Sequence, residues 1–147
     1  MKRFIGRVVT PGEVSSDAVV TKQGFNTLAS LQMALQFGDK KVKCGDQNNE
    51  ELYGKSLIGK ALCLPQTIGS TTGGLVIYCA CALKKNPACL LFSNHIDSLA
   101  AAGAVLAEVW ADGVTMPVVD CLGDEFINYV KDGMKITVKA NGVVEVE

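Results

Sequence analysis

The chain lacks several features that would place it in a common functional class. It has no tract of basic residues and its formal net charge is -1, so nothing in its charge favours nucleic acid or an anionic membrane. No apolar run reaches the ~20 residues of a membrane-spanning helix. The start, MKRFIGRVVTPGE, lacks the apolar segment of a signal peptide. We therefore expect a cytoplasmic protein with no nucleic-acid partner and no membrane association.

Recognisable metal-binding motifs are also missing. The chain has one histidine, His95, and no two of its six cysteines are spaced as C-x-x-C. Three of them lie within apolar runs, which is typical of buried free thiols in a reducing compartment: Cys63, Cys81 and Cys89. Cys44 lies in a polar segment and is the thiol we least expect to be buried. The sequence thus predicts no metal site made by this chain alone.

The chain does contain enough apolar residues to form one hydrophobic core. Of its 147 residues, 48% are hydrophobic and 20% charged, which predicts a single globular domain over residues 1–147. Residues 57–120 read as β–α–β–α–β, and their near-continuously apolar strands are typical of parallel strands buried on both faces. The two ends read as β-strands, with Asn141-Gly142 as a hairpin turn. We predict a three-layer α/β domain with a central parallel sheet and β-rich termini.

Other elements follow from local patterns. We expect strands over 4–10 and 14–21, a short helix that begins near Asn26, and an irregular surface excursion over 38–56. That excursion is either functional, mobile or an interface arm. The Ala-rich run 98–110, which ends in Trp110, is a helix that packs on its own sheet or against a partner. Residues 114–119 form a further strand, which Pro117 places at an edge or a bulge.

The chain is organised around Lys60–Lys85, KALCLPQTIGSTTGGLVIYCACALKK. A short apolar strand is followed by a polar, Gly-rich turn and then by an apolar helix. Such a turn presents hydroxyls and free N–H groups at a helix N-terminus, where the dipole contributes roughly half a positive charge. It is therefore a ready site for an anion. Ser70, Thr71 and Thr72 either contact a ligand there or only cap the helix.

Several catalytic motifs do not fit this turn. No Gly-Lys-Ser/Thr follows it, so it is not a P-loop, and its glycine spacing is not that of a Rossmann fingerprint. Position 68 is Ile68, so Ser70 does not lie in a nucleophile elbow. A triad of Ser70 with His95 and Asp97 is disfavoured, because the latter two lie in a turn that reads as ordinary helix capping.

Three segments together resemble one family. The loop GSTTGG after KALCLP, the run SLAAAGAVLAEVW and the start GRVVTPGE are similar to the small subunit of aconitase X, the swivelling domain of an aconitase-superfamily dehydratase. The resemblance extends from Phe4 to about Val119. It implies a swivelling β/β/α fold, which agrees with the three layers predicted above. It also implies a large-subunit partner that holds an iron–sulfur cluster through its cysteines, with the active site between the two subunits.

The resemblance also assigns roles to residues of this chain. It makes Ser70 the catalytic base, and it makes Gly69, Thr71 and Thr72 the residues that shape the loop and contact the substrate carboxylate. Phe25 and Asn26 are implied as further substrate-binding residues. Ser70 would take the α-proton of a hydroxy acid, and the β-hydroxyl would leave with help from iron on the partner.

The substrate depends on the branch of the family. Archaeal members carry a Ser-Phe-aromatic-Gly-Gly pattern where this chain has Gly24–Leu28, and they dehydrate a phosphorylated mevalonate. The segments GFNTLAS and CLPQTIGSTTGG look closer to the bacterial two-subunit branch, which is associated with dehydration of cis-3-hydroxy-L-proline to an imino acid. Phosphomevalonate is thus the alternative substrate. Outside this class, the chain would be a stand-alone small-anion-binding module without catalysis, or a purely structural subunit.

Overall fold

The computed structural model describes residues 1–147 and contains ten strands and four helices. The strands are β1 (Lys2–Ile5), β2 (Arg7–Thr10), β3 (Val14–Val20), β4 (Phe25–Asn26), β5 (Ala61–Leu64), β6 (Thr67–Ile68), β7 (Cys89–Phe92), β8 (Val118–Asp120), β9 (Lys135–Val138) and β10 (Val143–Val146). The helices are α1 (Thr27–Gln36), α2 (Gly73–Ala82), α3 (Ser98–Trp110) and α4 (Asp124–Tyr129). None of these helices is long and apolar enough to cross a membrane.

The predicted β–α–β–α–β unit is confirmed as β5-α2-β7-α3-β8. The three strands pair in parallel, with Cys63 opposite Leu91 and Leu91 opposite Val119. Every residue of these strands is buried. Their continuous apolar character arises because each face of the sheet is covered, one by the helices α1 to α3 and the other by a second group of strands.

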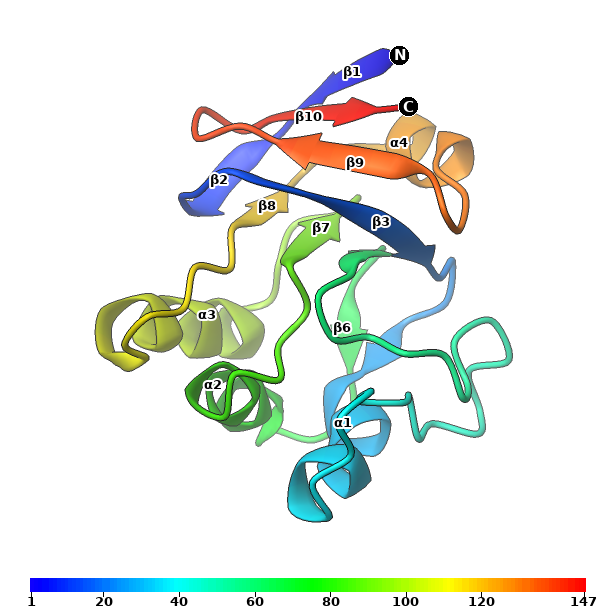
Figure 1. Ribbon diagram of the computed structural model, residues 1–147. Helices are drawn as coiled ribbons and strands as arrows, with labels where there is room; N and C mark the ends of the chain where they lie inside the picture. Colours follow the sequence, from blue (N-terminus) through cyan, green and yellow to red (C-terminus); the bar gives the residue numbers. More distant parts are fainter.

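Two bends in the chain turn one eight-stranded sheet into two layers. The expected single strand over 4–10 is divided at Gly6, so that β1 pairs with β10 while β2 pairs with β8. A Cβ at Gly6 would lie 2.5 Å from the carbonyl oxygen of Asp120, so only glycine fits at this corner. Strand β3 divides in the same way, pairing with β9 over Val14–Asp17 and with β5 over Ala18–Val20. Figure 1 shows the resulting β/β/α layers, with both termini at the end opposite α1, α2 and α3.

The strand predicted over 114–119 is corrected in its length and its position. Strand β8 is shorter than the predicted 114–119 and begins only after Pro117, whose missing N–H cannot join the ladder. It also lies between β7 and β2 rather than at an edge of the sheet, and the alternative of a bulge agrees with the register shift between Val8 and Thr10 in its pairing with β2. The hairpin predicted at Asn141-Gly142 is confirmed, because β9 and β10 pair antiparallel across it.

The irregular excursion over 38–56 is confirmed as a segment without regular strands or helices, but it is well anchored. Val42 and Leu52 are fully buried, and the N–H of Gly45 donates to the carbonyl of Ser30 on α1 at 2.9 Å. Cys44 is 1% exposed, so the expectation that it would be the least buried thiol is wrong. Cys121 is the exposed one, because it follows the last buried residue of β8.

Asp120 ties three parts of the domain together at the end of β8. Its carboxylate is fully buried and accepts hydrogen bonds from Arg7 Nε at 2.9 Å, from Arg7 Nη2 at 2.6 Å and from the N–H of Ile96 at 2.8 Å. Burial raises the pKa of this carboxyl, but the hydrogen bonds from Arg7 and Ile96 and the charge of Arg7 outweigh burial. The pKa therefore lies below its usual 3.8.

We expect Asp120→Asn to lower the free energy of unfolding by about 2 kcal/mol at neutral pH, because it removes charged hydrogen bonds from a buried group. A lowered native-state pKa stabilises the fold above the unfolded pKa, and this contribution disappears as the pH falls through the native value. Denaturant unfolding between neutral pH and acid should thus show a weaker pH dependence in the variant. Asp17→Asn is the control, since Asp17 forms an exposed ion pair with Lys135. An equal loss in both variants would contradict the role of Asp120.

Candidate functional site

The polar turn between β5 and α2 is held in place by a small second sheet. Residues Thr67 and Ile68 form β6, which pairs in parallel with β4, so that Phe25 faces Thr67 and Asn26 faces Ile68. This pairing brings the segment before α1 against the turn, although the two are about forty positions apart in sequence. The pairing with β4 therefore supports the turn just before α2 begins.

Ser70 lies at the start of α2 with its hydroxyl close to two donors. Its Oγ accepts a hydrogen bond from the N–H of Thr72 at 3.2 Å and lies 2.8 Å from Thr72 Oγ1. Thr72 is the N-cap residue of α2, yet its side chain makes no capping hydrogen bond to the helix. Its hydroxyl is engaged with Ser70 instead. The geometry thus does not support the interpretation that these hydroxyls serve only as helix caps.

The first turn of α2 also leaves backbone donors without acceptors. The N–H of Gly73 donates to the carbonyl of Ser70 at 3.0 Å, and that of Val76 donates to the carbonyl of Thr72 at 3.0 Å. No hydrogen bond is formed by the N–H groups of Gly74 and Leu75, as is usual at a helix N-terminus. With the dipole behind them, these two donors are suited to an anionic group of a ligand.

Asn26 supports the turn directly beneath Gly69. Gly69 has a φ of +97°, and a Cβ at this position would lie 2.7 to 2.8 Å from the side-chain amide atoms of Asn26. The same side chain caps α1, because Asn26 Oδ1 accepts from the N–H of Ala29 at 3.1 Å. The prediction that a helix begins near Asn26 is confirmed. Asn26 therefore links the start of α1 to the residue that precedes Ser70.

A polar pocket of about 190 Å³ opens in front of Ser70. Gly69, Ser70 and the first residues of α2 line one side, and the start of α3 lines the other. Its walls also contain three polar residues to which sequence reasoning gave no ligand-binding role: Thr27, Thr67 and Asp97. Asp97 is the only charged residue among them and is held by Thr67 Oγ1 and by the N–H groups of Leu99 and Ala100. No cationic side chain of this chain lines the pocket.

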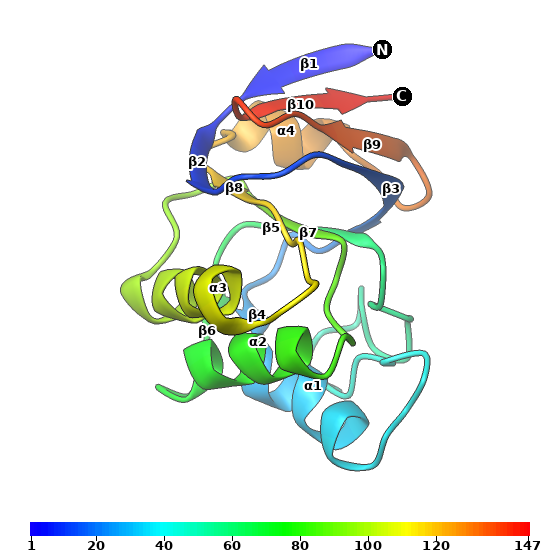
Figure 2. The ribbon, with the colours of Figure 1, turned by 60° about the vertical axis from the view of Figure 1, so that its left-hand side comes forward.

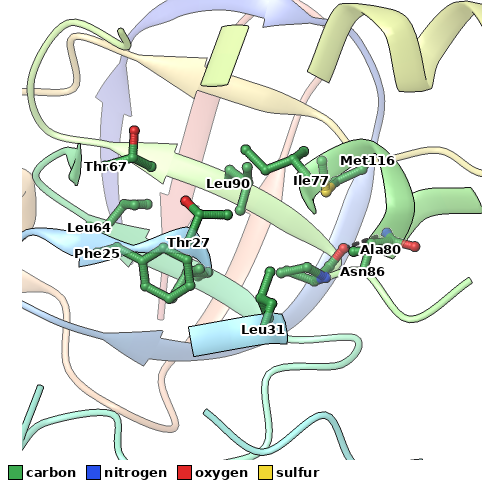
Figure 3. Close-up of a pocket in the computed structure, with 12 residues that line it drawn as sticks. Phe25, Thr27, Leu31, Leu64, Thr67, Ile77, Ala80, Asn86, Leu90 and Met116 are labelled. Atoms are coloured by element: carbon green, nitrogen blue, oxygen red, sulfur yellow. Dashed lines mark hydrogen bonds between the residues drawn. The ribbon is translucent and has the colours of Figure 1, made fainter. Parts of the chain in front are cut away.

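Of the five residues implied as substrate contacts, only Gly69 lines this pocket, whereas Phe25, Asn26, Thr71 and Thr72 do not. Phe25 is 3% exposed, and its ring lies with Leu31, Ile77 and Leu90 around a separate apolar cavity of about 20 Å³ in the core (Figure 3). Phe25, which is part of β4, therefore packs into the core and does not reach the pocket at Ser70. Thr71 is exposed and lies beside the pocket, on the side that faces the groove between α2 and α3.

The structure does not form the disfavoured triad: Asp97 shares the pocket with Ser70, but His95 does not line it. His95 is exposed, and its Nδ1 lies 2.7 Å from the carbonyl oxygen of Ile96. Asp97 caps α3 rather than orienting His95. Neither His95 nor Asp97 makes a hydrogen bond to Ser70, whose hydroxyl is bonded to Thr72.

The cysteines of this chain do not fit an iron–sulfur cluster. No group of three His, Cys, Asp or Glu side chains comes together in a way that could hold a metal ion. Burial raises the pKa of Cys63 well above its usual 9.0, that of Cys81 to about 11 and that of Cys89 to about 12. Thiols with raised pKa values are poor ligands, because a metal binds the thiolate.

Comparison with known proteins identifies the family. Residues 3–146 match the aconitase X swivel domain. The chain belongs to the aconitase X swivel domain family. The crystal structure of Thermococcus kodakaraensis aconitase X in its holo-form matches this swivel domain with a TM-score of 0.81 and 26% identity, covering 100% of this chain and 99% of that one. The predicted α/β fold and the predicted family are thereby confirmed.

Two curated relatives of this swivel domain illustrate the similarity. The phosphomevalonate dehydratase small subunit of Aeropyrum pernix is 31% identical over 98% of this chain and 92% of its own length. The protein of the same name from Methanosarcina mazei is 27% identical over 97% of this chain and 90% of its own length. In each comparison the match covers almost the full length of both this chain and the relative.

We expect Gly69→Ala to lower the turnover number of the assembled enzyme by about 100-fold. The new methyl group would strain the positive φ and push against Asn26, and so move Ser70, the residue that the family resemblance implies as the base. Gly54→Ala is the matched control: Gly54 has a similar φ of +78°, but nothing lies within 4 Å of the added methyl group. Steady-state kinetics that show equal losses for both variants would contradict the positioning role of Asn26.

Proposed function

We propose that this chain is the small subunit of a two-subunit hydro-lyase of the aconitase X type, and that Ser70 removes a proton from the substrate. One observation carries the proposal. The Ser70 hydroxyl stands at the start of α2, in a pocket, with the N–H and the hydroxyl of Thr72 within hydrogen-bonding distance. The names of the curated relatives support the reaction class and the existence of a larger partner.

A serine hydroxyl is a weak base unless its alkoxide is stabilised. In this loop the alkoxide at Ser70 Oγ would accept hydrogen bonds from the N–H and from the Oγ1 of Thr72, whose measured separations are 3.2 and 2.8 Å. The N-terminus of α2 adds roughly half a positive charge within the same turn. These fixed dipoles favour the deprotonated form of Ser70, which would take the proton next to the substrate carboxylate.

The substrate carboxylate has donors beside this base. The N–H groups of Gly74 and Leu75 are unpaired, and Gly74 lines the pocket. Thr72 is hydrogen-bonded to Ser70, Thr71 lines the adjacent groove, and the Asn26 side chain lies against Gly69. Substrate contacts through Gly69, Thr71, Thr72 and Asn26 remain part of this proposal. Thr27, whose buried side chain reaches the pocket, is added to it.

The remaining half of the site must come from the large subunit. We place the iron–sulfur cluster there, because the thiols of this chain do not fit it. The pocket is open to one side, and no group on this chain is suited to help a hydroxide leave. The isolated chain should therefore be inactive.

Two substrates with different charges remain candidates. The absence of any Lys, Arg or His from the pocket favours a small hydroxy amino acid such as cis-3-hydroxy-L-proline, whose single carboxylate needs only the backbone donors of α2. The names of the curated relatives favour phosphomevalonate. A phosphate group would then need its cations from the large subunit, because this chain supplies none at the pocket.

The test is to reconstitute the chain with the large subunit of the same organism and to assay dehydration of both compounds. Turnover of cis-3-hydroxy-L-proline alone supports the first substrate, and turnover of phosphomevalonate alone replaces it with the second. A stable complex that turns over neither compound would exclude both substrates and leave only the reaction class as the proposal. A chain that binds small carboxylates by itself, without any partner, would favour the stand-alone anion-binding module.

A further inference from the structure

The helix layer carries almost no charge. Helices α1, α2 and α3 contain a single charged residue, Glu108, although all three lie at the surface of the molecule (Figure 2). Their outer sides instead expose large apolar side chains, the most exposed being Leu75 at 62%, Val109 at 64% and Trp110 at 65%. Surfaces that stay in water normally carry charges of both signs. An apolar face of this kind marks an interaction site.

A groove of about 360 Å³ runs between α2 and α3 on this face. Leu75 and Tyr78 line it from α2, and Leu99, Leu106 and Trp110 line it from α3. On each helix these residues recur at intervals of three, four or seven, so each helix turns one stripe towards the groove. The backbones of the two helices meet directly where Gly74 lies against Gly103.

The groove is continuous with the pocket at Ser70. Gly74 and Leu99 line both, and Thr71 stands at the boundary. A body that covers the pocket therefore reaches the edge of the groove. Under the proposed function, the body that completes the pocket is the large subunit.

We infer that the α2–α3 groove is the docking surface for the large subunit, which inserts an uncharged apolar ridge between Leu106 and Trp110 on one side and Leu75 and Tyr78 on the other. This inference rests on the proposed function. A protein ridge fits the face better than a lipid surface, because helices that bind membranes carry Lys and Arg beside their apolar stripe and these helices carry none. Trp110 is the expected anchor, since exposed tryptophans are enriched among the residues that dominate binding.

The inference is tested by titrating the large subunit against Trp110→Lys and against Trp110→Ala, each compared with Ile5→Lys. Ile5 is 76% exposed on β1, in the layer farthest from the groove (Figure 1). Circular dichroism confirms that each variant is folded. We expect both Trp110 variants to weaken the complex by about 30-fold or more, as for an interface hot spot. We expect Ile5→Lys to bind like the original chain.

A second readout separates docking from catalysis. At saturating large subunit, Trp110→Lys should regain the original turnover number, because the Ser70 loop is unchanged, whereas Ser70→Ala should bind normally and stay inactive. Normal affinity of both Trp110 variants would overturn this inference and leave the proposed function standing. Failure of the original chain to bind the large subunit would overturn both. A homodimer that Trp110→Lys dissociates, with unchanged binding of the large subunit, would assign the groove to a second copy instead.

Discussion

Replacement of Ser70 by alanine is expected to lower the turnover number of the assembled enzyme by about 1,000-fold, within the range for loss of a general base. The substitution removes the one hydroxyl that stands between Thr72 and the pocket, while the backbone donors of Gly74 and Leu75 stay in place. Substrate should therefore still bind, so KM should change little. Steady-state kinetics of the reconstituted complex measure both parameters.

The matched control for this variant is Ser98→Ala. Ser98 is an exposed serine in the first turn of α3, and its side chain makes no hydrogen bond. It thus presents the same side chain at the start of a neighbouring helix without the contacts of Ser70. Activity near the original level in Ser70→Ala, or an equal loss in both variants, would show that Ser70 is not the base.

The second large effect is expected from Gly74→Ala, which should destabilise the fold by about 3 kcal/mol, the upper end for an overpacked interior. A Cβ at Gly74 would lie 2.2 Å from the carbonyl oxygen of Leu99, and a Cβ at Gly103 would lie 2.1 Å from the carbonyl oxygen of Gly74. Because backbone atoms meet here, α3 would have to move away from α2. For a chain of this size the melting temperature should fall by roughly 6 to 12 °C.

Gly73→Ala is the control at the adjacent position. A Cβ there would lie 3.6 Å from the Cβ of Thr27, which is ordinary van der Waals contact. Because alanine favours a helix over glycine by about 1 kcal/mol, this change should be neutral or slightly stabilising. Thermal unfolding of the two variants should therefore show opposite or clearly unequal shifts. A Gly74→Ala variant as stable as Gly73→Ala would show that the two helices are not in the contact described.

Local patterns were sufficient to predict much of the fold. The strands of the central unit are continuous apolar runs and the two long helices are bounded by clear turn residues, so β5, α2, β7 and α3 could be read from sequence. The long-range pairing of the strands could not be predicted from the sequence. Nothing in the sequence near Gly6 shows that the N-terminal strand divides between β10 and β8, because the reason lies in the backbone of Asp120.

The candidate site shows the same division. The turn that carries Ser70 was predicted because it stands between a strand and a helix, which is a local feature, whereas the role of Ser70 as a base came from the family resemblance. Thr27, Thr67 and Asp97 were given no place in the pocket, because only the pairing of β4 with β6 and the approach of α3 bring them to Ser70. The burial of Cys44 was missed for a similar reason, since its polar neighbours in sequence conceal the core that it faces.

The most direct test of the central claim is the rate of dehydration as this chain is added to a fixed amount of its large subunit, using the substrate that the reconstituted enzyme accepts. We predict no turnover by either subunit alone, a rate that rises and saturates with the original chain, and no rise when Ser70→Ala is added in its place. Turnover by the large subunit alone, or full restoration of the rate by Ser70→Ala, would contradict the claim that this chain supplies the base.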